Sequence, residues 1–113
     1  YIMKKRISGS KTEIVALNAE VKDKDVVIFD DMIRSGSSII KAAEAYKSVG
    51  ARSIFVVCVH GVFVDGSVEM FKKSGLIQKI HCTNTHTKAA CLDDPFVKVY
   101  DVSQIIIDGL DLF

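Results

Sequence analysis

The sequence has no tryptophan and only one proline, Pro95, among its 113 residues. Its seven glycines are scattered rather than clustered, so no Pro/Gly-rich linker divides the chain. We therefore expect residues 1–113 to form a single domain. Three cysteines at irregular spacing do not make a disulfide framework, and they favour reduced thiols in a cytoplasmic protein.

The charges show no excess of either sign. Fifteen Lys and Arg residues face fourteen Asp and Glu residues, for a formal net charge of +1. This balance gives no reason to expect binding to nucleic acid or to a membrane surface. No apolar run approaches the ~18 residues of a membrane span, and no signal-peptide core follows the first residues. Because the chain starts at Tyr1, inside an apparently structured segment, we expect a fragment of a longer protein.

Continuous apolar runs at residues 26–29 and 54–59 predict strands that are covered on both faces, as in a parallel sheet. Further strands are expected at 78–82 and 97–100, and an extended piece at 14–17.

Helical spacing of apolar residues predicts a helix that starts with Ser37 or Ser38 as its cap and ends at Gly50. A shorter helix is expected at 67–73, and a last one after Ser103. The alternation predicts an α/β fold, with a parallel sheet of about four to five strands and helices on both faces.

Ligands of such sheets bind at the carboxyl ends of the strands. Polar residues gather at these predicted ends: Asp30 and Asp31, His60 and Gly61, Thr83 to Thr85, and Asp101. His60 there could contact a ligand or cap a loop, and the sequence does not decide between the two.

Residues 26–38 contain the main candidate site. A predicted buried strand is followed by two carboxylates and then by a turn at which a helix begins. Gly36 allows a sharp turn and a close approach to a ligand. Hydroxyls, a guanidinium and free amides at the helix start would together form a cradle for a phosphate monoester. The residues concerned are Arg34, Ser35, Gly36, Ser37 and Ser38.

Asp30 and Asp31 are acceptors suited to a pair of vicinal hydroxyls, so the segment describes a sugar-phosphate site. Because successive strand residues point to opposite faces, we expect the two carboxylates not to need a shared proton or metal. The alternative is a strand that simply ends in two Asp residues before a helix-capping turn. No P-loop or dinucleotide-binding motif is present.

This segment resembles the phosphoribosyl-pyrophosphate motif of type I phosphoribosyltransferases. Together with Lys4-Lys5-Arg6, Val49-Gly50-Ala51, His60-Gly61-Val62-Phe63 and Thr83-Asn84-Thr85, it resembles the C-terminal domain of the ribose-phosphate pyrophosphokinases. The resemblance covers nearly the whole chain. It implies a type I phosphoribosyltransferase fold and, elsewhere in a longer protein, an N-terminal ATP-binding domain.

The resemblance also implies an activity: transfer of pyrophosphate from ATP to ribose 5-phosphate, with Mg²⁺ as cofactor, in a homo-oligomer. Asp30 and Asp31 would then hold the ribose hydroxyls, and residues 34–38 would form the 5-phosphate loop. Lys4 and Arg6 would be catalytic, stabilising charge on the transferred phosphoryl groups. Without the resemblance, the favoured interpretation of Lys4 and Arg6 is a basic end of the chain exposed to solvent.

Three positions depart from the family pattern. Arg34 stands where Asp is usual, Ser37-Ser38 where Gly-Thr is usual, and Val59 where Thr is usual. Two rival functions therefore stay open: a stand-alone type I phosphoribosyltransferase, which would need a base-binding hood that we do not find, and a non-catalytic regulatory homologue of the synthetase.

Three further features need an interpretation. The spacing of His81, Cys82, His86 and Cys91 matches no structural zinc pattern, and the first two would point to opposite faces of a strand. Cys58, inside an apolar run, is expected in the core. The apolar end of the chain, residues 105–113, should pack in the core, against an absent domain or against a subunit.

Overall fold

The computed structural model describes residues 2–8, 11–17 and 20–110, the first two stretches by their backbone alone. Strands β1 (Ile2–Ser8) and β2 (Lys11–Leu17) pair antiparallel in a two-stranded sheet. A second sheet holds β3 (Asp25–Ile33), β4 (Ser53–Gly61), β5 (Lys79–Thr83) and β6 (Val97–Tyr100). Its four strands are parallel and lie in the order β3-β4-β5-β6.

Helices connect the parallel strands: α1 (Ser37–Ser48) after β3, α2 (Ser67–Ser74) after β4 and the short α3 (Thr87–Ala90) after β5. Helix α4 (Ser103–Gly109) follows β6. The α/β fold with a parallel sheet is confirmed, and the predicted strands and helices agree with the observed ones to within a few residues at each end. The described residues contain no helix long and apolar enough to cross a membrane.

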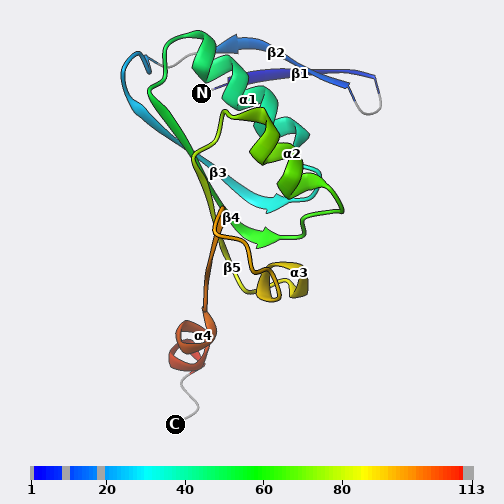
Figure 1. The fold of residues 1–113 in the computed structure, drawn as a ribbon, viewed down its shortest axis with the longest axis vertical. Helices are drawn as coiled ribbons and strands as arrows, with labels where there is room; N and C mark the ends of the chain where they lie inside the picture. Colours follow the sequence, from blue (N-terminus) through cyan, green and yellow to red (C-terminus); the bar gives the residue numbers. More distant parts are fainter. Residues whose placement is uncertain (1, 9–10, 18–19, 111–113) are drawn as a thin grey trace.

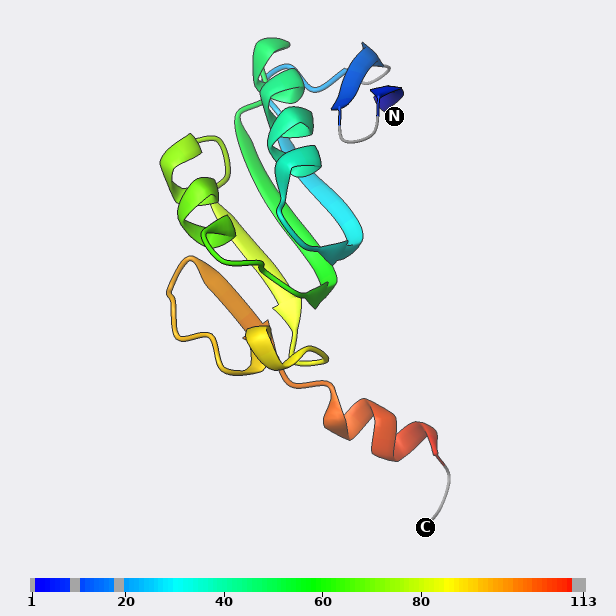
Figure 2. The same cartoon turned by 90° about the vertical axis from the view of Figure 1, so that its right-hand side faces the viewer.

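The core lies on one face of the sheet. Along β4 every second side chain is buried, as at Ile54 and Val56, and these pack with Ile39 of α1, Phe71 of α2 and Ala89 of α3. Figures 1 and 2 show α1 and α2 side by side over this face.

The opposite face carries apolar side chains that the described residues leave uncovered. Val27 is 47% exposed and Phe29 is 76% exposed. The sequence predicts helices on both faces, and the structure has the core helices on one. The reason is that a continuous apolar run shows that both faces of a strand are apolar, but it does not show what covers each of them.

The start of α1 also differs from the prediction. Gly36, in a left-handed conformation, is the N-cap, and no side chain among residues 20–110 caps the helix. The predicted cap Ser37 is already the first helical residue. At the other end Gly50 has φ +92°, as the prediction of a left-handed residue there requires.

Helix α4 extends from the carboxyl end of the sheet, away from α1 and α2 (Figures 1 and 2), and none of its residues is buried. Of the three alternatives for the apolar end of the chain, packing in the core is therefore wrong for residues 105–110, and packing against an absent domain or a subunit stays a prediction. Residues 111–113 lie outside the described part of the chain.

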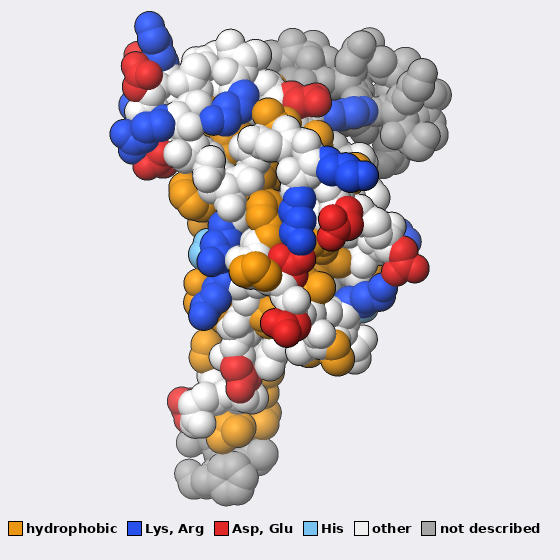
Figure 3. All heavy atoms as spheres, viewed as in Figure 1, with side chains coloured by type: hydrophobic (Ala, Val, Ile, Leu, Met, Phe, Trp, Pro, Cys, Tyr) orange, Lys and Arg blue, Asp and Glu red, His pale blue; other side chains and the backbone are white. Residues whose placement is uncertain are grey.

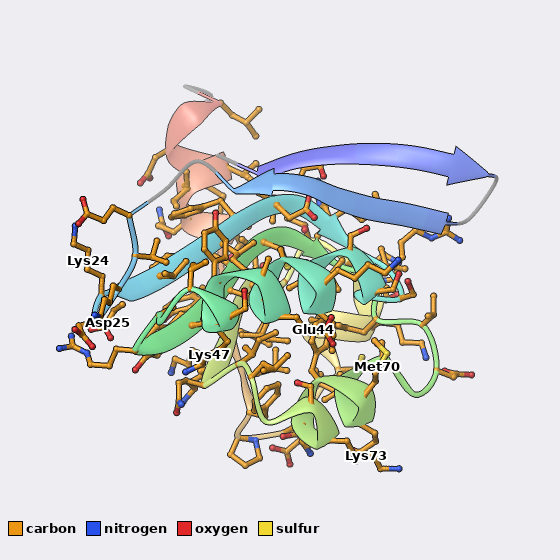
Figure 4. The ribbon with its side chains drawn as sticks, turned by 90° about the horizontal axis from the view of Figure 1, so that it is seen from above. Lys24, Asp25, Glu44, Lys47, Met70 and Lys73 are labelled. Atoms are coloured by element: carbon orange, nitrogen blue, oxygen red, sulfur yellow. The ribbon has the colours of Figure 1, made fainter. Side chains whose placement is uncertain are left out.

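The amino end of the sheet is held by an ion pair. Arg52 Nη2 lies 2.5 Å from Asp25 Oδ2, and its guanidinium lowers the pKa of that carboxyl. Figure 4 shows Lys24, Asp25 and Lys47 together at this end, where α1 finishes. The loops that could hold a ligand lie at the other end of the strands.

Candidate functional site

The turn between β3 and α1 encloses a cavity of about 210 Å³. Its walls come from a single continuous segment of chain: Asp30, Met32, Ile33, Arg34, Ser35, Gly36, Ser37, Ser38 and Ile39. The predicted phosphate loop and one of the two predicted carboxylates thus face a common space. Asp31 is not among the lining residues.

Gly36 is the residue on which the shape of this turn depends. Its φ is +80°, which L side chains rarely adopt. A Cβ at this position would lie 2.1 Å from Cζ of Phe71, so the loop rests directly on the aromatic ring. Phe71 is fully buried and comes from α2; the sequence predicts this helix but gives no sign that Phe71 lies beneath the site.

A neighbouring loop is hydrogen-bonded to the backbone of this turn. After β4, the backbone N–H groups of Val62 and Phe63 donate to the Ile33 carbonyl at 3.0 and 3.1 Å. The Val64 N–H donates to the Arg34 carbonyl at 3.1 Å. These bonds fix the backbone of the turn while its side chains stay exposed.

The start of α1 presents donors toward the cavity. The first N–H groups of a helix have no partner within the helix, and here no side chain caps them in the described residues. The nearest substitute is weak, because Ser37 N donates to Ser35 Oγ at 3.5 Å. The Ser35 and Ser37 hydroxyls lie 3.3 Å apart. Amides and hydroxyls therefore converge where the positive end of the helix dipole attracts an anion.

The two carboxylates interact, contrary to the expectation that strand alternation separates them. The Asp31 N–H donates to Asp30 Oδ1 at 2.8 Å. Partial burial raises the pKa of the Asp30 carboxyl, and hydrogen bonding and repulsion from the Asp31 carboxyl raise that pKa further. Both residues lie within β3, whose ladder with β4 continues through Met32 and Ile33, so the alternation of side chains alone does not keep the two groups apart. Asp30 already accepts this backbone N–H, and vicinal hydroxyls would supply further donors to the two carboxylates.

The other predicted strand ends meet at the same edge of the sheet. Thr83 Oγ1 and Thr85 Oγ1 both donate to the Val59 carbonyl, at 2.6 and 3.1 Å. His60 Nδ1 lies 2.7 Å from Thr85 Oγ1. His60, near the end of β4, therefore joins this strand to the loop after β5, as the loop-capping interpretation expects.

Lys4 and Arg6 lie in β1, and their side chains are outside the described residues. Their predicted catalytic role stays a prediction.

The cysteines and histidines are spread over different layers. Within residues 20–110 no three His, Cys, Asp or Glu side chains are grouped to hold a metal ion. Cys58 and Cys82 are buried neighbours on β4 and β5, as expected for core residues, whereas His81 lies on the other face of β5. Hydrogen bonding to Cys82, followed by burial, raises the pKa of the Cys58 thiol, whereas the same hydrogen bond lowers the pKa of the Cys82 thiol.

Comparison with known proteins identifies the family. The family model of the phosphoribosyl synthetase-associated domain matches residues 3–111. The chain belongs to this family. A ribose-phosphate pyrophosphokinase of Pyrococcus furiosus is 36% identical over 106 residues, which are 94% of this chain and 35% of that protein. The enzyme of Thermotoga maritima is 42% identical over 82 residues, 73% of this chain and 26% of that protein.

A solved structure supports the fold. The phosphoribosylpyrophosphate synthetase of Mycobacterium smegmatis superposes with a TM-score of 0.75 at 21% identity, over 91% of this chain and 33% of that one. The chain thus spans about a quarter to a third of the length of these relatives. The resemblance read from the sequence is confirmed at the level of family and fold.

Proposed function

We propose that this phosphoribosyl synthetase-associated domain binds ribose 5-phosphate and phosphoribosyl pyrophosphate, as part of a ribose-phosphate pyrophosphokinase that transfers pyrophosphate from ATP to ribose 5-phosphate in nucleotide biosynthesis. The observation that carries the proposal is the cavity of about 210 Å³, in which the first turn of α1 meets a carboxylate of β3. A phosphate and a ribose diol need these two chemistries side by side.

Each part has a defined role in the proposal. The amides and hydroxyls of residues 35–38, with the Arg34 guanidinium, hold the 5-phosphate. Asp30 and Asp31 accept hydrogen bonds from the ribose hydroxyls. The raised pKa of the Asp30 carboxyl indicates that its proximity to the Asp31 carboxyl is unfavourable. Hydrogen bonds from the ribose diol would offset this repulsion.

Mg²⁺ is part of the proposal, and the donor set allows it in a limited way. Asp30 and Asp31 are hard oxygen donors, and the described residues gather no third carboxylate or histidine around them. Mg²⁺ commonly uses one or two carboxylates, several waters and the phosphates of a substrate. The carboxylates would hold the ion only together with the substrate, and the ion would supply charge neutralisation to the pyrophosphate group. ATP and catalytic cations, Lys4 and Arg6 among them, belong to the same proposal.

The alternative of a non-catalytic regulatory homologue rests on Arg34, which lines the cavity where the synthetases usually carry Asp. Activity of the longer parent protein and of its Arg34→Asp variant separates the two. ATP-dependent synthesis by the parent supports the enzyme. An inactive parent that gains nothing from Arg34→Asp favours the regulator. The 113-residue chain by itself is expected to show no synthesis.

The direct test is calorimetric titration of the chain with ribose 5-phosphate and with phosphoribosyl pyrophosphate, with and without Mg²⁺. Saturable binding that is weakened in Asp31→Asn supports the proposal. The absence of binding by a folded sample contradicts it. Asp65→Asn is the matched control, because Asp65 is an exposed carboxylate in the turn before α2 and lies outside the cavity.

A further inference from the structure

Two cysteines of the core lie side by side, and the proposed site does not use them. Cys58 on β4 and Cys82 on β5 are register partners in the parallel sheet. Both side chains belong to the core, and each residue is 2% exposed. Val56 and Ile80, two residues earlier on the same strands, are buried beside them. Because residues of this chain bury the pair, its environment is a property of this domain and not of an exposed surface.

The two thiols are placed so that a disulfide requires little movement of the backbone. The side chains are hydrogen-bonded to each other. Neighbouring strands lie about 4.8 Å apart, and the Cα atoms of disulfide-bonded cysteines are about 4.4–6.8 Å apart. The Cβ atoms of a disulfide are about 3.5–4.5 Å apart, so closing the bond draws β4 and β5 slightly together at this row.

The hydrogen bond between the thiols makes them unequal. It lowers the pKa of the Cys82 thiol, and together with burial it raises the pKa of the Cys58 thiol. A thiolate, and not a thiol, is the nucleophile in reactions of cysteine. Cys82 is therefore the sulfur that reacts first, and Cys58 is the one that resolves.

The same row of the sheet reaches the proposed sugar-phosphate site. Asp30 on β3 pairs with Cys58, and Cys58 pairs with Cys82. Asp30 lines the cavity before α1. A change in the spacing of β4 and β5 at this row consequently takes place one strand away from a carboxylate of the site.

A small oxidant can reach the pair when the edge of the sheet at β6 opens. Strand β6 has four residues, lies at the end of the described sheet and pairs with Cys82 through Val99. Helix α4, which follows it, has no buried residue, and Figure 3 shows hydrophobic side chains at its surface, at the lower end of the molecule. Short edge elements with few buried contacts open more often than the core. We expect a slow reaction, because both thiols are buried in the closed state.

We propose that Cys58 and Cys82 form a reversible disulfide when hydrogen peroxide oxidises them, and that this bond weakens ligand binding at the cavity before α1. The formation of the disulfide is independent of the proposed function, whereas its effect on ribose 5-phosphate binding rests on that function. Disulfides of this kind in proteins of a reducing compartment are usually transient and redox-sensing.

The reaction proceeds in two steps. The Cys82 thiolate attacks one oxygen of the peroxide and breaks the O–O bond, which leaves a sulfenic acid on Cys82. The hydroxide that departs takes up the proton lost by the Cys82 thiol and becomes water. The Cys58 sulfur then attacks the sulfenic sulfur, and its own proton leaves with the displaced hydroxide as a second water. Two electrons from the two thiols thus reduce one peroxide, and a dithiol reagent reverses the bond by exchange.

The first test measures the bond by mass spectrometry on the folded Cys91→Ser chain, because Cys91 is an exposed thiol that would react by itself. After treatment with hydrogen peroxide and alkylation in denaturant, we expect the intact mass to lack two hydrogens and positions 58 and 82 to carry no alkyl group. Dithiothreitol should restore both thiols. Two thiols that stay alkylatable, or oxygen added to one cysteine without a disulfide, would overturn the proposal.

The order of the two steps is tested in the same background with Cys58→Ala and Cys82→Ala. Peroxide should leave Cys58→Ala with a sulfenic acid on Cys82, which dimedone traps. Cys82→Ala should give little adduct, and circular dichroism checks that both variants are folded. Equal adducts in the two variants would overturn the assignment of Cys82 as the attacking thiol.

The effect on the site is tested by titrating ribose 5-phosphate into the oxidised and the reduced Cys91→Ser chain. We expect the disulfide to weaken binding about fivefold and dithiothreitol to restore it. Peroxide should not change the affinity of the matched control, Cys91→Ser with Cys82→Ala. Equal affinities of the oxidised and reduced chains would contradict the coupling to the site.

A reduced chain that binds no ribose 5-phosphate would contradict the proposed function, and the mass measurement would still decide the disulfide. In that case the backbone amide NMR signals of Asp30 and Asp31 report the coupling without a ligand. They should shift between the reduced and the oxidised chain, and unchanged signals would overturn the coupling.

Discussion

The turns before α1 and α2 have the same backbone conformation at their glycines but different side chains around them. Both α1 and α2 begin directly after a glycine in the left-handed conformation, Gly36 with φ +80° and Gly66 with φ +84°. Each glycine is followed by a serine, and neither helix has a side-chain cap. On backbone geometry alone, both helix starts would suit an anion.

Their surroundings separate them. The turn before α1 carries three serine hydroxyls and the Arg34 guanidinium around its cavity. The turn before α2 carries Asp65, whose carboxylate pairs with Lys88 at 2.6 Å, and Glu69 in the first helical turn. Two carboxylates repel a phosphate, and the nearby cation is already paired. The turn before α1 offers a phosphate three hydroxyls and a cation beside Asp30, whereas the turn before α2 offers carboxylates and a cation that is already paired.

The support beneath the two glycines also differs. Gly36 is packed against Phe71, whereas a Cβ at Gly66 would meet nothing within 4 Å. Contact with Phe71 therefore supports the turn before α1, whereas the turn before α2 has no such packing at its glycine.

Exchanging each glycine for alanine should give the largest difference. Gly66→Ala should cost about 1–2 kcal/mol of unfolding free energy, the price of a left-handed conformation. Gly36→Ala adds an overlap with the Phe71 ring, for a total of about 2–5 kcal/mol. Denaturant unfolding measures both, and calorimetry should find ribose 5-phosphate binding lost in Gly36→Ala alone. Equal costs for the two variants would contradict the role of Phe71 as support.

Neutralising one carboxylate beside each turn is expected to give the next largest effect. Asp31→Asn should weaken ribose 5-phosphate binding about ten- to hundredfold, because a charged hydrogen bond contributes roughly 1.5–3 kcal/mol. Asp65→Asn should leave the affinity unchanged. Calorimetric titration with thermal melts measures binding and stability separately. If Asp31→Asn lowers the melting temperature so far that unfolding explains the weaker binding, a direct contact between Asp31 and the ligand is contradicted.

Removing the cation of each turn should have a smaller effect. Arg34→Ala should weaken binding about five- to tenfold at low salt, and less as salt screens the interaction. Lys88→Ala should not alter binding, because that cation serves Asp65. Titrations at two or three salt concentrations check this, and an affinity of Arg34→Ala that equals that of the unmodified chain would exclude phosphate contact by Arg34.

The smallest effect concerns the pH dependence that Asp30 introduces. Because its folded-state pKa is raised, its protonated form favours the folded chain, and this contribution to stability is lost as the pH rises through that pKa. Asp30→Asn should therefore raise the melting temperature slightly at pH 7 and not at pH 3. Asp25 has the opposite sign, because Arg52 lowers its pKa, and Asp25→Asn should lower the melting temperature at pH 7. Melts at both pH values test the pair, and equal shifts at pH 3 and 7 would contradict it.

The strands and helices of the main sheet were predictable because apolar runs and glycines mark them. The helix predicted at 67–73 is observed as Ser67–Ser74, and the strand predicted at 97–100 as Val97–Tyr100. The extended piece expected at 14–17 lies within β2, whereas β1 was not predicted. The four-residue α3 is too short to show a helical period.

The site was predictable where one continuous segment builds it, as residues 30–38 do. Phe71 escaped prediction, because its contact with Gly36 joins residues that are far apart in the sequence and no local pattern reports it. The interaction of Asp30 with Asp31 was missed because side-chain alternation considers side chains alone, whereas the Asp30 carboxylate accepts a hydrogen bond from the backbone N–H of Asp31. The uncovered sheet face was missed because a buried and an exposed apolar side chain look alike in a sequence.

The most direct test of the account follows the backbone amide NMR signals of both turns while ribose 5-phosphate is added to the isotopically labelled chain. We expect saturable shifts of the amides of residues 36–39, with one affinity, and unchanged amides at residues 66–69. Shifts of comparable size in both turns, or in neither, would contradict the claim that side-chain chemistry makes the turn before α1 the phosphate site.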